Sequence, residues 1–155
     1  MNRIDKINEF IRKGYTVDFK TGKIFKNGKE MGSKTKRGYI HLGTRLNGKP
    51  IKLRAHHFVY YCYNGQDIPE GLFIDHINGI RDDNRITNLR VVTNQENHFN
   101  RTTTKGYYWS KHHQKYKTQI MIDGKSINLG SYETEEEART AYLEAKKQHH
   151  IIKNN

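Results

Sequence analysis

The stretch FIDHINGIRDDNRITNLRVVTNQEN, residues 73 to 97, decides how the centre of the chain folds. Phe73–His76 and Leu89–Val92 are short apolar runs typical of paired strands, and the loop between them is rich in Gly, Asp and Asn. Thr93 followed by Glu96 three positions later is the capping-box pattern that begins a helix. The stretch therefore predicts a strand, a loop, a second strand and a helix.

This order can bring polar side chains from both ends of the stretch together: Asp75, His76 and Asn97, with Asn88 bracing the loop. Neighbours on a regular strand face opposite sides, so such a site also requires the backbone to bend at Asp75–His76, and Gly79 makes a bend possible. The same residues also fit an ordinary polar loop in which Asn88 is a turn residue.

Composition favours a polyanionic partner. The 155 residues include 28 Lys and Arg against 16 Asp and Glu, a formal net charge of +12. Such a surface attracts nucleic acid. There is no apolar stretch long enough for a signal peptide or a membrane span, so we expect a protein that is neither secreted nor bound to a membrane. The single cysteine, Cys62, excludes an internal disulfide and favours a reducing, cytoplasmic location.

The first third of the chain predicts one helix, several short strands and a second helix. Isoleucines recur at helical spacing at the start of the chain. They are Ile4, Ile7 and Ile11. Hairpin turns are expected at Asn27-Gly28 and Asn47-Gly48. Residues 55–65, AHHFVYYCYNG, predict a short buried helix that ends at Asn64-Gly65, with His56 packed in the core rather than bound to a metal.

Residues 106–150 follow a different pattern. Lys115–Ile122 alternates, so one set of side chains packs and the other faces outward. The packed set is Tyr116, Thr118, Ile120 and Ile122. After the turn at Asp123-Gly124, Ile127 and Leu129 are expected to point inward. Thr134 and Glu137 form a capping box for a final helix. Its apolar stripe is Ala138, Ala141, Tyr142 and Ala145.

The central motifs resemble those of the HNH nucleases, in the branch found in phage and intron-borne homing endonucleases. They are H56HFV59, I74DHING79, D83NR85, N88LR90 and T93NQEN97. The resemblance covers residues 15 to 100, and Tyr15–Phe25 is similar to the small β module that often precedes this nuclease core. Asn97 stands where many HNH proteins have their last His, and the resemblance suggests that this branch accepts Asn there as a metal ligand.

The resemblance implies an α+β fold with a ββα-metal (His-Me finger) nuclease core. It implies that His76 is the general base, that Asn88 braces the loop, and that Asp75 and Asn97 bind a divalent ion, Mg²⁺ or Mn²⁺. The substrate would be double-stranded DNA, cut by a monomer or weak dimer. This hypothesis requires Asp75 and Asn97 to share an ion, and the His76 ring to face a groove that DNA can enter.

The C-terminal segment is similar to the Apetala/ethylene-response-factor (ERF) DNA-binding domain, on Gly106, Lys115-Tyr116, Leu129-Gly130 and T134EEEARTAY142. That family places a three-stranded antiparallel sheet, backed by one helix, in the major groove. The DNA contacts that we expect are Tyr108, Ser110, Lys115, Lys117 and Gln119, joined by Arg90 and Arg101 of the nuclease part. In the alternative interpretation the two lysines only solubilise the sheet. Trp109 and Tyr116 are expected in the core.

These expectations divide the chain into residues 1–54 (helix and β module), 55–101 (nuclease core), 102–105 (linker) and 106–155 (DNA-binding domain). The favoured function is a metal-dependent homing-type DNA endonuclease, phage-encoded and active in the cytoplasm of a bacterial host. The alternative is a catalytically inactive, sequence-specific DNA-binding regulator. A structural or RNA-binding accessory protein is the third hypothesis.

Overall fold

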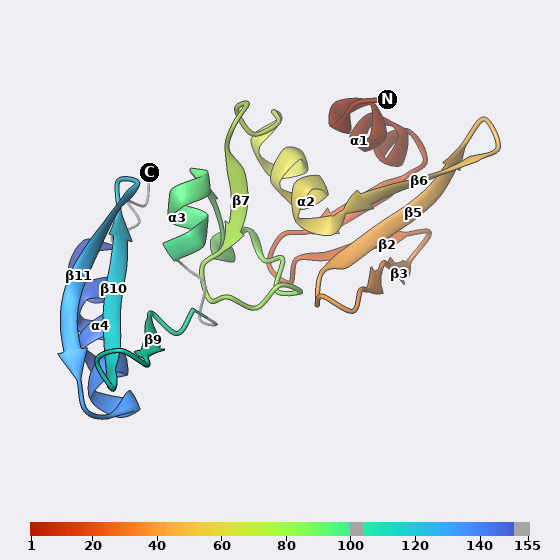
Figure 1. Ribbon diagram of the computed structural model, residues 1–155. Coiled ribbons are helices and arrows are strands. Elements are labelled where there is room, and N and C mark those ends of the chain that lie inside the picture. The colour runs from red at the N-terminus through yellow and green to blue at the C-terminus, as the bar shows by residue number, and fades with distance from the viewer. Residues whose placement is uncertain (100–103, 151–155) are drawn as a thin grey trace. The chain divides into compact units, whose positions relative to one another are not determined.

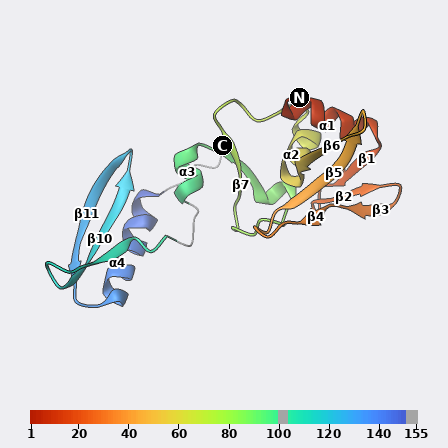
Figure 2. The same ribbon diagram turned by 45° about the vertical axis from the view of Figure 1, so that its right-hand side comes forward.

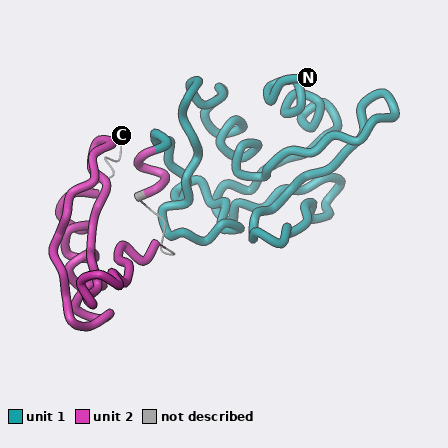
Figure 3. Tube along the Cα trace, viewed as in Figure 1, with its two compact units in different colours: residues 1–94 teal, residues 95–155 magenta. Residues whose placement is uncertain are grey.

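The protein consists of two compact units, residues 1–94 and 95–155, in a computed structural model that describes residues 1–99 and 104–150 (Figure 3). Each unit contains helices and an antiparallel sheet, which confirms the predicted α+β class. Within the described ranges, no helix is both long enough and apolar enough to cross a membrane. The finer domain boundaries at residues 54, 101 and 105 stay predictions.

Helix α1 spans Arg3–Arg12, where the isoleucine spacing predicts a helix. Its buried face differs from the predicted one. Ile7 and Phe10 are fully buried, whereas Ile4 and Ile11 are 41% and 45% exposed. The reason is that Ile7 and Phe10, three positions apart, share the face that packs against the strands, so the other two isoleucines lie at the edges of that face.

The β module consists of two three-stranded antiparallel sheets, in the orders β1-β2-β3 and β4-β5-β6. The strands are β1 (Tyr15–Asp18), β2 (Lys23–Lys26), β3 (Lys29–Met31), β4 (Ser33–Lys34), β5 (Ile40–Leu46) and β6 (Lys49–Arg54). Both predicted hairpin turns are confirmed. Asn27-Gly28 and Asn47-Gly48 have positive φ at both residues, 49° and 73° in the first and 49° and 76° in the second, as a type I′ turn requires.

Helix α2 (Ala55–Asn64) ends at Gly65, whose φ of 69° confirms the predicted stop. Helix α1 packs against β1 and β6, and helix α2 packs against β5 and β6 (Figures 1 and 2). Between these elements lies the core of the unit, in which Phe10, Leu42 and Phe58 are almost completely buried. This core supports the strand pair that carries the predicted site.

The central stretch folds in the predicted order. Strand β7 (Phe73–His76) pairs antiparallel with β8 (Leu89–Val92), a 3₁₀ helix η1 (Ile86–Asn88) precedes β8, and α3 (Asn94–Phe99) follows Thr93. The bend expected at Asp75–His76 is wrong. Pairing continues without interruption through Asp75 opposite Arg90 and His76 opposite Leu89, and the chain turns only at Gly79, where φ is +73°.

The second unit has the predicted three-stranded antiparallel sheet and one helix. The strands are β9 (Tyr107–Ser110), β10 (Lys115–Ile122) and β11 (Lys125–Tyr132), in the order β11-β10-β9. Helix α4 (Glu135–His149) begins with the predicted Thr134–Glu137 capping box. It packs on the sheet through Ala138, Tyr142 and Ala145, which are all buried.

Two of the packing predictions for this unit are wrong. Trp109 is 48% exposed rather than in the core, and Ile127 is 44% exposed rather than inward. Thr118 and Ile120 on β10 are almost completely buried, and the Thr118 hydroxyl donates to the Ala138 carbonyl of α4 at 3.3 Å. The helix therefore covers the middle of β10, whereas the Trp109 and Ile127 side chains lie where its cover is incomplete.

Candidate active site

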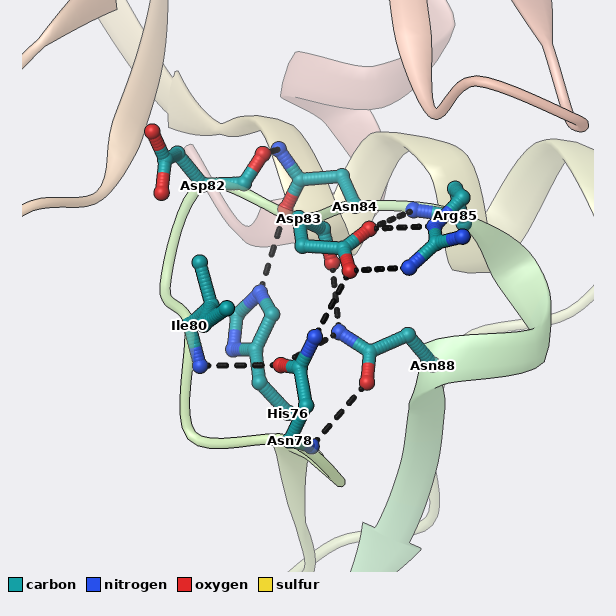
Figure 4. A network of polar contacts seen from close by, with 8 residues as sticks. All are labelled: His76, Asn78, Ile80, Asp82, Asp83, Asn84, Arg85 and Asn88. Carbon is teal, nitrogen blue, oxygen red and sulfur yellow. Dashed lines mark hydrogen bonds and ion pairs between the residues drawn. The ribbon is translucent and has the colours of Figure 1, made fainter.

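The His76 ring is held at the end of β7 by a buried amide (Figure 4). Its Nε2 lies 3.2 Å from Oδ1 of Asn84, and the Asn84 amide nitrogen donates to the Asp82 carbonyl at 3.4 Å. Because an amide oxygen only accepts, Nε2 carries the hydrogen, and the basic nitrogen of the neutral ring is Nδ1. His76 and Asn84 are 4% and 3% exposed. The ring therefore has one tautomer and one orientation.

The surroundings of His76 favour its neutral form. Burial lowers the pKa of the ring below its usual value, although the Asn84 hydrogen bond and the nearby charge of Asp75 act in the opposite direction. An imidazole that is neutral near physiological pH can accept a proton. In this state His76 is suited to act as a general base.

Two further rings pack around His76. The His56 ring meets it edge-on, with centroids 5.2 Å apart, and the Tyr39 ring lies 6.0 Å away. His56 is 2% exposed, and its Nδ1 has no hydrogen-bond partner in the described part of the chain. Burial, and then the positive charges around it, lower the pKa of His56 to about 2. These contacts confirm the prediction that His56 packs in the core.

Asn88 ties together both sides of the loop between β7 and β8 (Figure 4). Its Oδ1 accepts from the Asn78 backbone N–H at 3.1 Å, and its Nδ2 donates to Asn78 Oδ1 at 3.0 Å and to the Asp83 carbonyl at 2.8 Å. The side chain is buried. The predicted contact of Asn88 with the loop is therefore present, and any catalytic role acts through the position of that loop.

The two acidic residues of the loop are engaged by cations. Asp83 accepts from Arg85 at 2.8 and 2.6 Å and from the Asn78 amide at 2.7 Å. The hydrogen bond from Arg85 is the main reason that the pKa of Asp83 falls to about 2. Lys34 lies 2.5 Å from Asp82. Both carboxylates thus stabilise the loop.

Asp75 forms an ion pair with its partner on β8. Its Oδ2 accepts from Nε and Nη2 of Arg90 at 3.0 and 2.8 Å, and both side chains are largely buried. The Asp75 charge also acts on the neighbouring His76 ring, where it favours the protonated form. Arg90, which we expect to contact DNA, is engaged with Asp75 in this structure.

The remaining predicted residues of the nuclease part lie beyond the first unit. Asn97 is half-buried on α3, in the second unit, so its role as a ligand beside Asp75 stays a prediction. Arg101 lies outside the described residues.

On the sheet of the second unit, Lys115 pairs with Ser110 and Lys117 pairs with Tyr108, which places these four side chains on one face. Gln119 follows them on that face of β10.

The expected metal ligands are oxygen donors. Across residues 1–99 and 104–150, no three or more His, Cys, Asp or Glu side chains are grouped so that they could hold an ion. Mg²⁺ can be held by one or two hard oxygen ligands when waters and substrate phosphates complete its shell. The Asp75 carboxylate is a donor of this chemical type.

Residues 53–99 match the family model described as HNH endonuclease. An uncharacterized HNH endonuclease of Acanthamoeba polyphaga mimivirus is 29% identical over 93 residues, which is 59% of this chain and 50% of the relative. Protein 3.8 of an Escherichia phage is 34% identical over 85 residues, 50% of this chain and 69% of that protein. The chain thus spans about half to two thirds of the length of these relatives.

The DNA endonuclease I-HmuI of Bacillus phage SP01 is 35% identical over 102 residues, 59% of this chain and 57% of that protein. A solved structure of this HNH homing endonuclease covers 74% of this chain and 71% of its own, with 29% identity and a TM-score of 0.49.

A strand pair that ends in a buried, oriented histidine, with a loop braced by amides and a following helix, defines a nuclease core of the ββα type. The chain belongs to the HNH endonuclease family. This confirms the family resemblance seen in the central motifs. The nuclease assignment agrees with relatives that are themselves named endonucleases.

Sequence reasoning missed two residues that hold His76. Asn84, between Asp83 and Arg85, orients the ring directly. Its signal was present, because the D83NR85 motif contains it. Tyr39 gave no such signal, since it comes from a distant turn and reaches His76 only through the packing of the β module.

Proposed function

We propose that this chain is a metal-dependent DNA endonuclease of the homing type, which hydrolyses phosphodiester bonds in double-stranded DNA. The observation that carries the proposal is the buried His76 ring, whose Nε2 is held by Asn84 and whose burial favours the neutral form. Nδ1 of His76 takes a proton from a water molecule as the water oxygen attacks the phosphorus. The new P–O bond forms while the bond to the leaving deoxyribose oxygen breaks.

Asp75 and Asn97 are the residues proposed to hold the divalent ion, with Mg²⁺ preferred and Mn²⁺ as the alternative. When bound, the ion would stabilise the negative charge on the scissile phosphate and on the leaving oxygen. Arg90 holds the Asp75 carboxylate by two hydrogen bonds. Asn88 keeps the loop in place, and with it the Asn84 amide that orients His76.

We propose that the second unit reads DNA in the manner of an Apetala/ERF-like domain. Its sheet carries Tyr108, Ser110, Lys115, Lys117 and Gln119 on one face. Lys115 also lies 2.7 Å from Glu133, so this lysine would exchange a carboxylate for a phosphate. We further propose that the protein acts as a monomer or weak dimer in the cytoplasm of a phage-infected bacterium, and phage relatives support that setting.

Plasmid cleavage tests the proposed function. Supercoiled plasmid is incubated with Mg²⁺ and either wild type, His76→Ala or His149→Ala. The last variant makes the same chemical change on an exposed part of α4. Wild type and His149→Ala should nick the plasmid, and His76→Ala should be slower by about 10²-fold or more, as for loss of a general base. Equal rates for wild type and His76→Ala would remove His76 from the mechanism.

Two observations favour a second candidate, a DNA-binding regulator without cleavage activity. Only 4% of His76 is exposed, and the Asp75 carboxylate is already bonded to Arg90. The regulator would bind a specific duplex and never cut it. The same plasmid assay, run with Mg²⁺ and with Mn²⁺ beside a binding assay, separates the two. Any scission by wild type that His76→Ala lacks would exclude the regulator.

A further inference from the structure

Two guanidinium groups from distant parts of the first unit lie over the same tyrosine ring. Cζ of Arg54, the last residue of β6, is 5.1 Å from the centroid of the Tyr39 ring. Cζ of Arg81, in the loop after β7, is 5.2 Å from it. The Tyr39 ring also lies 6.0 Å from the His76 ring. One aromatic side chain thus joins both cations to the proposed general base.

Neither cation is neutralised. In the described parts of the chain, no carboxylate lies within ion-pair distance of Arg54 or Arg81. Both residues are exposed. Arg85 and Arg90, on the same part of the fold, are instead paired with carboxylates. The two unpaired arginines are therefore available to an anion from solvent.

Contacts of the loop after β7 hold Arg81 in place. Nη1 of Arg81 donates to the Arg37 carbonyl at 2.9 Å, and the neighbouring Asp82 bonds to Lys34 at 2.5 Å. Both contacts fix the loop after β7 against the turn between β4 and β5. In that turn Gly38 has a φ of +87°, and a Cβ there would lie 3.7 Å from the Arg81 side chain. The turn and the loop are packed together, so Arg81 is preorganised, and Arg54 meets it over the shared Tyr39 ring.

We propose that Arg54 and Arg81, supported by the Tyr39 ring, bind a backbone phosphate of the DNA substrate that flanks the scissile phosphate. A guanidinium that stacks on a ring keeps N–H donors along its edge, and its planar fork matches the oxygens of a phosphate. The phosphate would then lie beside the Tyr39 ring that contacts His76. The inference rests on the proposed function and names how the substrate backbone is held next to His76.

The test measures how salt weakens DNA binding. A protein that loses one phosphate contact loses about 0.9 from the slope of log K against log salt concentration. The probe is a duplex of mixed sequence, bound in EDTA so that no cleavage occurs. The variant is Arg54→Gln/Arg81→Gln. The matched control is Arg45→Gln/Lys49→Gln, which also removes two exposed positive charges, at the other end of the β5–β6 hairpin.

We expect the slope of Arg54→Gln/Arg81→Gln to fall by about 0.9 more than the slope of the control variant. With Mg²⁺, its cleavage should show a KM raised about tenfold with little change in kcat, as for lost substrate binding. Equal slopes for the two double variants would overturn the inference, because only general charge would then matter.

The two proposals fail separately. If His76→Ala cuts as fast as wild type while the arginine variant still loses slope, the proposed mechanism is wrong and the phosphate site stands. If the arginine variant behaves like the control, the phosphate site is wrong whatever His76→Ala does.

Discussion

Acidification is expected to destabilise the first unit, because His56 is buried there as a neutral ring. Burial is the main reason that its pKa falls from 6.5 to about 2. In the unfolded chain the ring returns to its ordinary pKa and binds a proton below 6.5, whereas in the folded chain it does not. The unfolded state therefore binds more protons, and the free energy of unfolding falls as the pH falls.

The size of this loss in the free energy of unfolding follows from the uptake of one proton by His56 when the chain unfolds. Between about pH 7 and about pH 5, a histidine that titrates only when unfolded lowers the free energy of unfolding by about 2 kcal/mol. The loss begins near the unfolded pKa and continues down to the folded one. His57 acts in the same direction, because burial, followed by the charges of Arg3 and Arg54, lowers its pKa to about 4.

Urea unfolding of the full chain at several pH values measures this loss. Labelling of Cys62, the single cysteine, reports on the first unit because Cys62 packs against its core. His56→Phe keeps an aromatic ring and removes the titrating group. Whatever its stability at neutral pH, this variant should lose about 2 kcal/mol less than wild type over the same pH interval. The exposed His149→Ala is the control. Equal losses in wild type and His56→Phe would refute the reasoning.

Three further substitutions test the network and the second unit. Asn84→Ala should lower the single-turnover cleavage rate by about 10- to 100-fold, since the His76 ring loses its orientation, and an unchanged rate would contradict this. Asn88→Ala removes three hydrogen bonds from a buried site, so the free energy of unfolding in urea should fall by about 2 to 3 kcal/mol. An unchanged urea midpoint would mean that the loop does not depend on these three hydrogen bonds. Gly106→Ala would place a Cβ 2.1 Å from the Tyr142 ring at a φ of +79°, so the second unit should unfold at a lower urea concentration. Fluorescence of the single tryptophan measures this transition, and an unshifted transition would show that the ring can move aside.

Local patterns predicted the elements of both units well. The turns at Asn27-Gly28 and Asn47-Gly48, the helix stop at Gly65 and the Thr134 capping box depend on residues that are close in the sequence. Burial was predicted less well. Trp109 and Ile127 are exposed, although strand alternation assigns them to a face, because alternation does not tell whether that face is covered at a given position.

For this protein, the sequence by itself determined the order of elements, the family and the loop that carries His76, because motifs and turn residues act over a few positions. Only the tertiary structure decided what surrounds that histidine. Tyr39, Arg54 and Arg81 are far apart in the chain, and they meet because the β4–β5 turn packs against the loop after β7. Contacts of this kind depend on the shape of the whole unit, and local sequence spacing does not encode them.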